Sequence, residues 1–445
     1  MAKWRRVAGL WMCVGLSLAA AGALAGVVAQ AQSALFEPEL SKPPKERALP
    51  GRFADKPSIA PSWSIPVEPL GFAAPGPIYM GSRYAMASLD FLDEDHLLFT
   101  FHVPGLLRRD NREGDERQIR AMVLELPSGA VRADTRWTVH DHARYLWMLK
   151  GGHFLVRDRE SVFEGDASLV LKPVLHFPGP LLWLDLDPAQ SLVVTDSIEP
   201  AAAPGGDGDV PSPETASASL SADGEDAAAA PDYVLRILRR ASGQVMLVSR
   251  VRELLHLPIN SDGYLESLRG LHEDWELNLH YFTGGSRIVG SVESTCAPGS
   301  EFISDREALV TGCSDDGGDS LTAMTTDGQK LWAVRTPATA VWPQVTMAPN
   351  GSRIAREVLA VTQAINAFSP LSTDDIKGQE VTVFDAATGE VALEAQASPI
   401  LDIGGNVAIS PTGRRVAVVN AGAIQVFELP APPALPVVGQ NAPAR

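Results

Sequence analysis

The residues best suited to chemistry lie in one short run, His140-Asp141-His142, which is closely followed by Arg144. On an extended segment, two histidines at positions i and i+2 point to the same side, so they can bind one metal ion if a third ligand joins them. Alternatively, His and Asp in a loop between strands hydrogen-bond to neighbouring segments. We name His140, Asp141, His142 and Arg144 as candidate ligand-binding residues.

Three tryptophans, Trp147, Trp183 and Trp342, each lie near the start of a predicted strand. Aromatic side chains at such positions pack in the core between strands, or they line the rim of a central channel where a ligand meets both rings and loops. Core packing is the commoner role. Trp183 and Trp342 are nevertheless kept as candidate ligand contacts.

A third group of candidates is acidic. Asp315, Asp316 and Asp319 lie in a Gly-rich turn and could hold Ca²⁺, although they match no known calcium loop; a polar turn is the alternative. The chain contains no G-x-S-x-G nucleophile motif and no C-x-x-C-H haem motif, so we predict no catalytic residue. The cofactor stays unknown, with Ca²⁺ or Zn²⁺ as the metals that these residues would suit.

The N-terminus favours export. Residues 1–31 combine basic residues, an apolar run and an A-x-A site, which is the pattern of a signal peptide; an uncleaved anchor is the alternative and would be the only membrane contact. After cleavage, only Cys296 and Cys313 would remain. A disulfide between them suits a periplasmic or extracellular protein, whereas two buried free thiols are the alternative.

Net charge excludes one class of partner. The chain carries 54 acidic and 37 basic residues, a net charge of −17. Nucleic acids require clustered Lys and Arg, so we predict no nucleic-acid binding.

A strand–turn–strand pattern recurs along the chain. Residues 345–355 and 407–417 match type by type around Pro-x-Gly turns, and 184–194 is a looser copy in which Gln190 replaces the glycine. A second hairpin signal, a small or acidic residue followed by Gly between two apolar runs, recurs with a period of about 40 to 45 residues. This period is the length of one four-stranded propeller blade. The second signal occurs at Gly129, Gly165, Gly243, Gly284, Gly328 and Gly389.

These repeats predict seven blades, of which the last has three strands at 407–429. An open ring would expose a sheet edge, so we expect Trp63 to Phe72 to supply the missing strand. The predicted organisation is a Pro-rich linker at 32–60, a propeller at 61–429 and a disordered tail at 430–445. Within the propeller, the acidic, Ala/Gly/Pro-rich insertion at 199–231 is predicted to be disordered.

The turns resemble those of the bacterial WD40-like or YVTN-type β-propellers. The resemblance rests on Ser410-Pro411-Thr412-Gly413 and on the D-x-x-T-G-x-V hairpin from Asp385 to Val391. It implies an all-β, seven-bladed propeller of four-stranded antiparallel blades. The shared motifs specify strands and turns, so the resemblance implies no catalytic residues.

The long segments between predicted strands indicate a binding face. They run from Pro104 to Gln118, Asp196 to Asp232, Ser314 to Ser320 and Arg356 to Gln379, and each joins the second strand of a blade to the third. Insertions on one face of a repeat protein usually mark its binding surface. We expect a monomeric, non-catalytic protein that binds a protein or small ligand there. The alternative is a propeller enzyme, either a metal-assisted hydrolase or lactonase or a quinone-dependent dehydrogenase.

Overall fold

The computed structural model describes residues 46–49, 56–74, 87–103, 108–109, 115–140, 144–199, 233–270, 274–365, 371–401 and 405–433. These ranges fall within one compact unit, Pro43–Arg445. The predicted signal peptide lies outside them, as do nearly all of the insertion at 199–231 and most of the tail. Among the described residues, no helix has the length and apolar character needed to cross a bilayer.

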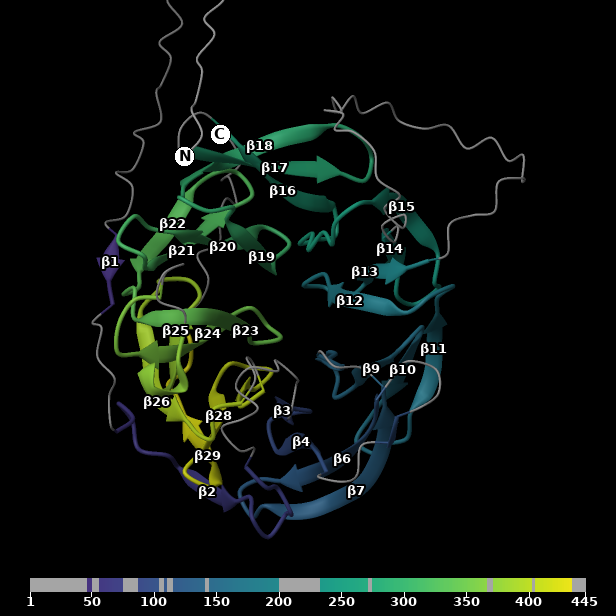
Figure 1. The fold of residues 1–445 in the computed structure, drawn as a ribbon, viewed down its shortest axis with the longest axis vertical. Helices are drawn as coiled ribbons and strands as arrows, with labels where there is room; N and C mark the ends of the chain where they lie inside the picture. Colours follow the sequence, from purple (N-terminus) through teal and green to yellow (C-terminus); the bar gives the residue numbers. More distant parts are fainter. Residues whose placement is uncertain are drawn as a thin grey trace, which may run out of the picture. The chain divides into compact units, whose positions relative to one another are not determined.

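Seven antiparallel blades follow one another around a ring, which confirms the predicted fold class (Figure 1). Blade 1 contains β3 (Ala87–Phe91), β4 (His96–His102), β6 (Asp115–Glu125) and β7 (Ala130–Val139), with β5 (Arg108–Arg109) paired to β6. Blade 2 contains β8 (Leu146–Met148), β9 (Phe154–Asp158), β10 (Ser161–Gly165) and β11 (Lys172–His176). Blade 3 contains β12 (Leu181–Leu186), β13 (Leu192–Ile198), β14 (Tyr233–Arg239) and β15 (Val245–Val251).

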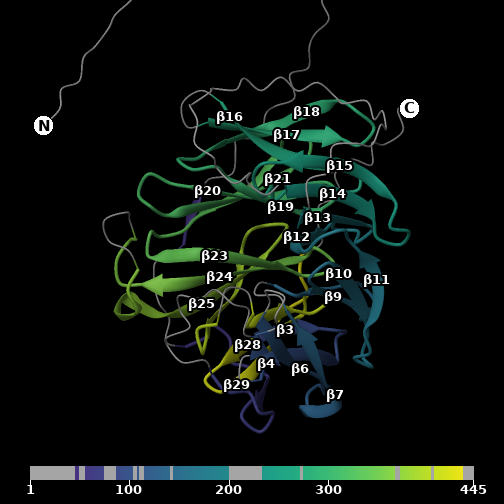
Figure 2. The same ribbon diagram turned by 45° about the vertical axis from the view of Figure 1, so that its right-hand side comes forward.

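The remaining blades keep the same order. Blade 5 contains β19 (Gly299–Ser304), β20 (Glu307–Cys313), β21 (Asp319–Thr325) and β22 (Lys330–Arg335). Blade 6 contains β23 (Ala340–Met347), β24 (Arg353–Val361), β25 (Ile376–Asp385) and β26 (Val391–Ala397), with the short 3₁₀ helix η2 (Thr373–Asp375) before β25. Figure 2 shows the same ring turned, with blade 4 at one end and blade 1 at the other.

Blade 4 differs from the others at its innermost position. Its regular strands are β16 (Gly263–Arg269), β17 (Asp274–Tyr281) and β18 (Ser286–Glu293). The inner position is held by residues 257–260, which form a single bridge between Ile259 and Tyr264 and accept one further bond, from Leu265 N to Pro258 O at 3.0 Å. The inner strand of this blade is therefore almost absent.

The ring closes as the sequence predicts. Blade 7 consists of β27 (Val407–Ile409), β28 (Arg415–Asn420), β29 (Ala423–Glu428) and β2 (Trp63–Pro66), so its outer strand comes from the N-terminal side of the chain. Phe72, which follows β2, packs against Phe99 and Phe101 of blade 1, with ring centroids 5.5 and 5.4 Å apart. Residues 63–72 thus complete one blade and join it to the next.

A feature that the sequence did not predict precedes this closing strand. Residues 46–49 and 56–66, which we call the N-terminal strap, lie along three blades (Figure 1). Within the strap, β1 (Arg47–Ala48) adds in parallel to the outer edge of β22. Further along, Ser58 N donates to Glu394 O on β26 at 2.9 Å. The strap therefore covers the edges of blades 5 and 6 before it closes blade 7.

The predicted turns occur where expected, and one shows how the pattern tolerates an exception. Gly351 and Gly413 have φ of 71° and 72°, and Gln190, at the equivalent turn of blade 3, has φ of 59°. This conformation is strained for a residue with a side chain. The side chain compensates, since Gln190 Nε2 donates to Met148 O at 3.1 Å and thereby ties blade 3 to blade 2.

The long connections do join second to third strands, as in blades 1, 3 and 6, but several predicted limits are wrong, including Gln118 and Ser320, which lie in β6 and β21. β24 continues to Val361 and β25 begins at Ile376, so Arg356 and Gln379 belong to strands. Asp196 likewise lies inside β13. These polar residues occupy buried strand positions because they find partners in neighbouring segments, a pattern that alternation of apolar residues does not reveal.

Candidate functional site

Of the predicted His140-Asp141-His142 run, the structure describes His140, which contacts Asp158. The backbone N–H of His140 donates to Asp158 Oδ1 at 2.8 Å, and its Nδ1 lies 3.1 Å from the same oxygen. Asp158 ends β9, so this pair fixes the connection between blades 1 and 2. Asp141 and His142 lie outside the described residues. Among the residues that are described, no group of three His, Cys, Asp or Glu side chains is arranged to hold a metal ion.

Arg144 interacts with a different group of residues. It is exposed, its Nε donates to Leu146 O at 3.0 Å, and its guanidinium lies over the Trp147 ring at 5.2 Å from the centroid. Trp147 itself is 4% exposed and belongs to the core between blades 2 and 3. The charge of Arg144 acts on three carboxyl groups, those of Asp90, Asp185 and Glu301.

These three carboxyl groups come from the inner strands of three blades. Asp90 lies on β3, Asp185 on β12 and Glu301 on β19. Asp90 and Asp185 are half-buried, whereas Glu301 is accessible to solvent although protein atoms surround its carboxyl group. Along β3 and β12, apolar residues on either side of each Asp pack in the core, and the Asp occupies the alternate position.

Enclosure makes ionisation of these groups unfavourable. Burial raises the pKa of Asp90 to about 6, although the Ser88 hydroxyl, which donates at 2.5 Å, and Arg144 oppose the shift. Burial and the charge of Asp185 raise the pKa of Glu301 to about 7, and Arg144 lowers it. The pKa of Asp185 is also raised by burial. The charge of one guanidinium therefore acts on all three carboxyl groups, and the charge of Asp185 also disfavours that of Glu301.

An aromatic pair lies beside these acids. The ring of Trp183, on β12, stacks on His256 with centroids 4.7 Å apart and an interplanar angle of 4°. Trp183 is half-buried and His256 is exposed. Burial lowers the pKa of His256, and the charge of Asp185 opposes that shift. His256 is accordingly neutral at pH 7 and adds an aromatic surface without a compensating charge.

Asp196 lies directly behind this pair. It is opposite Trp183 in the β12–β13 register, so the two side chains share a face of blade 3. Asp196 is 0% exposed, and its Oδ2 accepts a hydrogen bond from Leu255 N at 3.1 Å. Its Oδ1 has no hydrogen-bond partner within the described part of the chain. Burial raises the pKa of Asp196 to about 6.

The irregular inner position of blade 4 explains why these residues meet. The segment that leads into it, residues 252–258, forms no strand and exposes Leu254 and Leu255 to 43% and 37%. It brings His256 onto Trp183, where a regular blade would present an inner strand. We call Asp90, Arg144, Trp183, Asp185, His256 and Glu301 the inner-ring site.

The other predicted residues lie elsewhere. Trp342 is half-buried at an irregularity of β23 and has φ of 55°. Asp319 pairs with Arg356 at 3.0 Å, and Asp316 accepts from Gly318 N at 3.1 Å within a turn. Sequence reasoning identified Arg144 and Trp183 but missed Asp90, Asp185, His256 and Glu301. The available signal was an acid between apolar residues in a first strand, as in Leu184-Asp185-Leu186.

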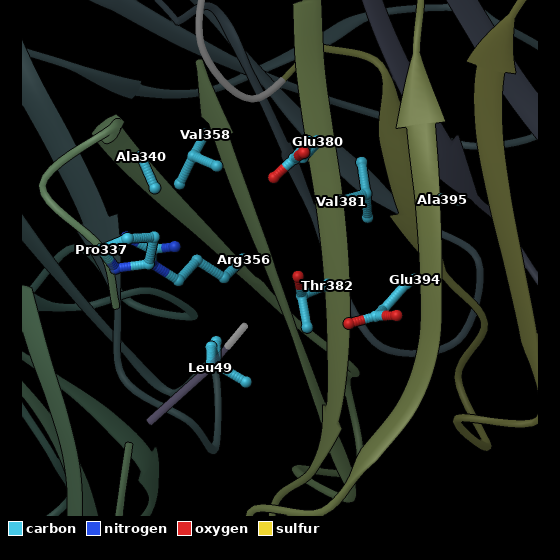
Figure 3. A pocket seen from close by; sticks show the side chains of 10 residues that line it. All are labelled: Leu49, Pro337, Ala340, Arg356, Val358, Glu380, Val381, Thr382, Glu394 and Ala395. Carbon is cyan, nitrogen blue, oxygen red and sulfur yellow. The ribbon is translucent and has the colours of Figure 1, made fainter. Parts of the chain in front are cut away.

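A second candidate is a cavity of about 40 Å³ at the junction of blades 5 and 6 (Figure 3). Arg356, 2% exposed, lies in its wall and donates to Asp319 Oδ2 and Thr336 Oγ1 at 3.0 and 3.2 Å. Burial, and then the charge of Glu394, raise the pKa of the neighbouring Glu380 to about 7. Leu49 of the strap caps the cavity. This volume suits ordered water and is too small for an organic ligand.

The predicted disulfide is confirmed near this junction. Cys296 and Cys313 are joined with an S–S distance of 2.04 Å. Cys313 lies opposite Asp319 in the β20–β21 register. The bond therefore fixes the turn that presents Asp319 to Arg356.

No known protein-family model matches the sequence, and no curated protein matches it. Among solved structures, the chain is similar to an acylaminoacyl peptidase from Pyrococcus horikoshii (10% identity, TM-score 0.45), covering 79% of this chain and 52% of that one. It is also similar to the propeller domain of the Trilobed protease from Pyrococcus furiosus (10%, TM-score 0.41; 80% and 99% covered). TolB from Acinetobacter baumannii is a third similar structure (10%, TM-score 0.36; 74% and 76% covered).

This chain spans about half the length of the acylaminoacyl peptidases that it matches. At these identities, the likeness concerns the fold alone, and assignment to the WD40-like or YVTN type stays a prediction. What is established from the blades themselves is that the chain is a seven-bladed β-propeller.

Proposed function

We propose that this chain is an exported, non-catalytic binding protein that holds a small ligand at the inner-ring site. The observation that carries the proposal is an aromatic pair, Trp183 on His256, beside carboxyl groups on the inner strands of three blades, on which the charge of a single guanidinium acts. Charged groups that serve stability alone are normally paired. Polar groups that converge beside an aromatic wall are typical of ligand sites.

The position of the site fits a role in binding. His256 and Arg144 belong to connections between the outer strand of one blade and the inner strand of the next, and these connections share a face with the long loops. A ligand held at the ring's centre would thus meet the face that carries the insertions. The disulfide supports the proposal of export, because such bonds persist in oxidising compartments.

The test uses Trp183 as a local reporter. The full chain would be labelled with 5-fluorotryptophan, the Trp183 resonance would be assigned with Trp183→Phe, and a fragment library balanced for charge would be titrated. We expect some fragments to shift Trp183 and not the buried Trp332 between blades 5 and 6, which is 4% exposed.

Asp185→Asn should weaken the binding of those fragments, whereas Glu276→Gln, at an exposed position of β17, should not. If no fragment shifts Trp183, or if Asp185→Asn leaves every affinity unchanged, the proposed function is wrong.

A further inference from the structure

The surplus of negative charge defines what the inner-ring site would accept. Asp90, Asp185 and Glu301 bring three acidic groups, Arg144 brings one positive charge, and His256 is neutral at pH 7. The charge of Asp185 disfavours that of Glu301. A bound cation would relieve this repulsion, whereas an anion would increase it.

The aromatic pair adds a second requirement. Trp183 and His256 are nearly parallel, and the exposed Leu254 and Leu255 lie in the segment that carries His256. An indole face attracts cations and stacks with flat rings. The molecule already uses this attraction next to the site, where the guanidinium of Arg144 lies 5.2 Å from the Trp147 ring centroid.

Asp196 points to a ligand independently of the acidic cluster. Its side chain is fully buried on the strand next to Trp183, one oxygen accepts a hydrogen bond from Leu255 N, and the other has no partner among the described residues. A buried acceptor without a donor is unfavourable unless another group satisfies it. Asp196 lies on the same face of blade 3 as Trp183. An N–H donor of a ligand on this face would satisfy its Oδ1.

The arrangement of the acids selects among cations. In the described part of the chain, no three acidic, His or Cys side chains gather closely enough to coordinate one metal ion. Groups spread over β3, β12 and β19, next to an aromatic wall, suit a cation with several N–H donors on an extended, planar frame.

We infer that the inner-ring site binds an organic cation, an amidinium, guanidinium or ammonium group joined to a planar aromatic ring. This inference rests on the proposed function and names the ligand class of the same site. The cationic group would lie between Asp185 and Glu301, and the aromatic ring would lie on Trp183 or His256.

The experiment compares matched probes on the labelled full chain. Benzamidine and benzamide have nearly the same shape but differ in charge, as do tryptamine and indole-3-ethanol. We expect at least one cation to shift the Trp183 resonance and to bind about tenfold or more tightly than its neutral partner. Glu301→Gln and Asp185→Asn should each reduce that preference by about threefold or more, and Glu276→Gln should not.

The outcomes separate the two proposals. If neutral or anionic fragments shift Trp183 at least as strongly as the cations, the site binds ligands and the inference about charge is wrong. If both carboxamide variants keep the full preference for the cation, the inference is also wrong, because the acids do not confer it. If neither these probes nor any library fragment affects Trp183, the proposed function itself fails.

Discussion

Two regions of this ring contain enclosed charged side chains, and the charges are balanced differently in the two regions. At the junction of blades 5 and 6, the buried Arg356 donates to Asp319 and Thr336, and Leu49 of the strap covers the small cavity beside it. At the inner-ring site, Asp185 and Glu301 face a single Arg144, and water reaches the group.

The difference distinguishes structural charge from functional charge. Arg356 costs free energy to bury, and its hydrogen bonds to Asp319 and Thr336 offset that cost within the folded chain. The acids of the inner-ring site lack sufficient positive charge, so the folded chain alone does not satisfy them. The strapped junction should therefore matter for stability, and the inner ring should matter for binding.

The largest effect is expected from removing the segment that closes the ring. Deleting Trp63–Phe72 removes β2 together with Ile65, Val67 and Phe72, which are buried in the core between blades 7 and 1. We expect a loss of at least about 5 kcal/mol of unfolding free energy. Denaturant unfolding would measure it, and a midpoint unchanged from wild type would disprove the closure.

Deleting only residues 46–49 gives a matched comparison. This change removes β1 and the Leu49 cap but leaves β2 in place. The expected loss is about 1–2 kcal/mol, because a two-residue strand and one apolar side chain are removed.

Breaking the charge pair of the strapped junction should come next. Arg356→Ala leaves Asp319 half-enclosed without its cation, and we expect a loss of about 3–5 kcal/mol. Arg335→Ala is the control, since the Arg335 side chain is 48% exposed and its distances to Glu46 and Asp316 are 3.6 and 4.0 Å. It should change stability by at most about 1 kcal/mol. Equal losses for the two variants would contradict the structural role of Arg356.

The disulfide should contribute no more to the unfolding free energy than Arg356 does. It closes a loop with a sequence separation of 17 residues, and the double variant Cys296→Ser, Cys313→Ser should lose about 3 kcal/mol. Unfolding of wild type with and without reductant provides the same comparison. No change on reduction would show that the bond does not constrain the chain.

The last effect has the opposite sign and concerns the inner ring. The pKa of Glu301 is raised to about 7 in the folded state, against an ordinary value of 4.5. The folded protein therefore keeps this proton when the unfolded chain has lost it, and stability falls as the pH rises from 4.5 towards 7. Glu301→Gln should remove this pH-dependent loss of stability.

Thermal unfolding at several pH values would test this sign. Glu301→Gln should equal wild type below about pH 4.5 and be the more stable of the two above about pH 7. Glu276→Gln, at an exposed position of β17, is the control. A Glu301→Gln variant that is less stable than wild type at neutral pH would mean that this carboxylate has a structural partner.

Much of the fold was predictable because its signals are local. Pro-x-Gly turns such as Ser410 to Gly413 fix the hairpins, and the missing strand of the last blade predicted the closing role of residues 63–72. The strap was not predicted, since β1 pairs over only two residues and leaves no periodic pattern.

The inner-ring site was only partly predictable because it depends on contacts across the ring. Trp183 and Arg144 stand out by residue type, but nothing local shows that Asp185 and Glu301, on strands of different blades, act on each other. The irregular inner strand of blade 4, beside which His256 lies, also leaves no periodic pattern in the sequence. Polar residues inside strands, such as Arg356 and Asp196, were taken for loop because their partners lie in other segments.

The most direct test of the account is the ionisation of Glu301 itself. The full chain would be labelled with ¹³C at the glutamate side-chain carboxyls, the Glu301 signal would be assigned by its loss in Glu301→Gln, and its shift would be followed with pH in the absence of ligand. The account predicts a pKa of about 7, because burial and Asp185 both disfavour the charge. Ionisation near the ordinary value of 4.5 would contradict it, because neither burial nor Asp185 would then disfavour the Glu301 carboxylate.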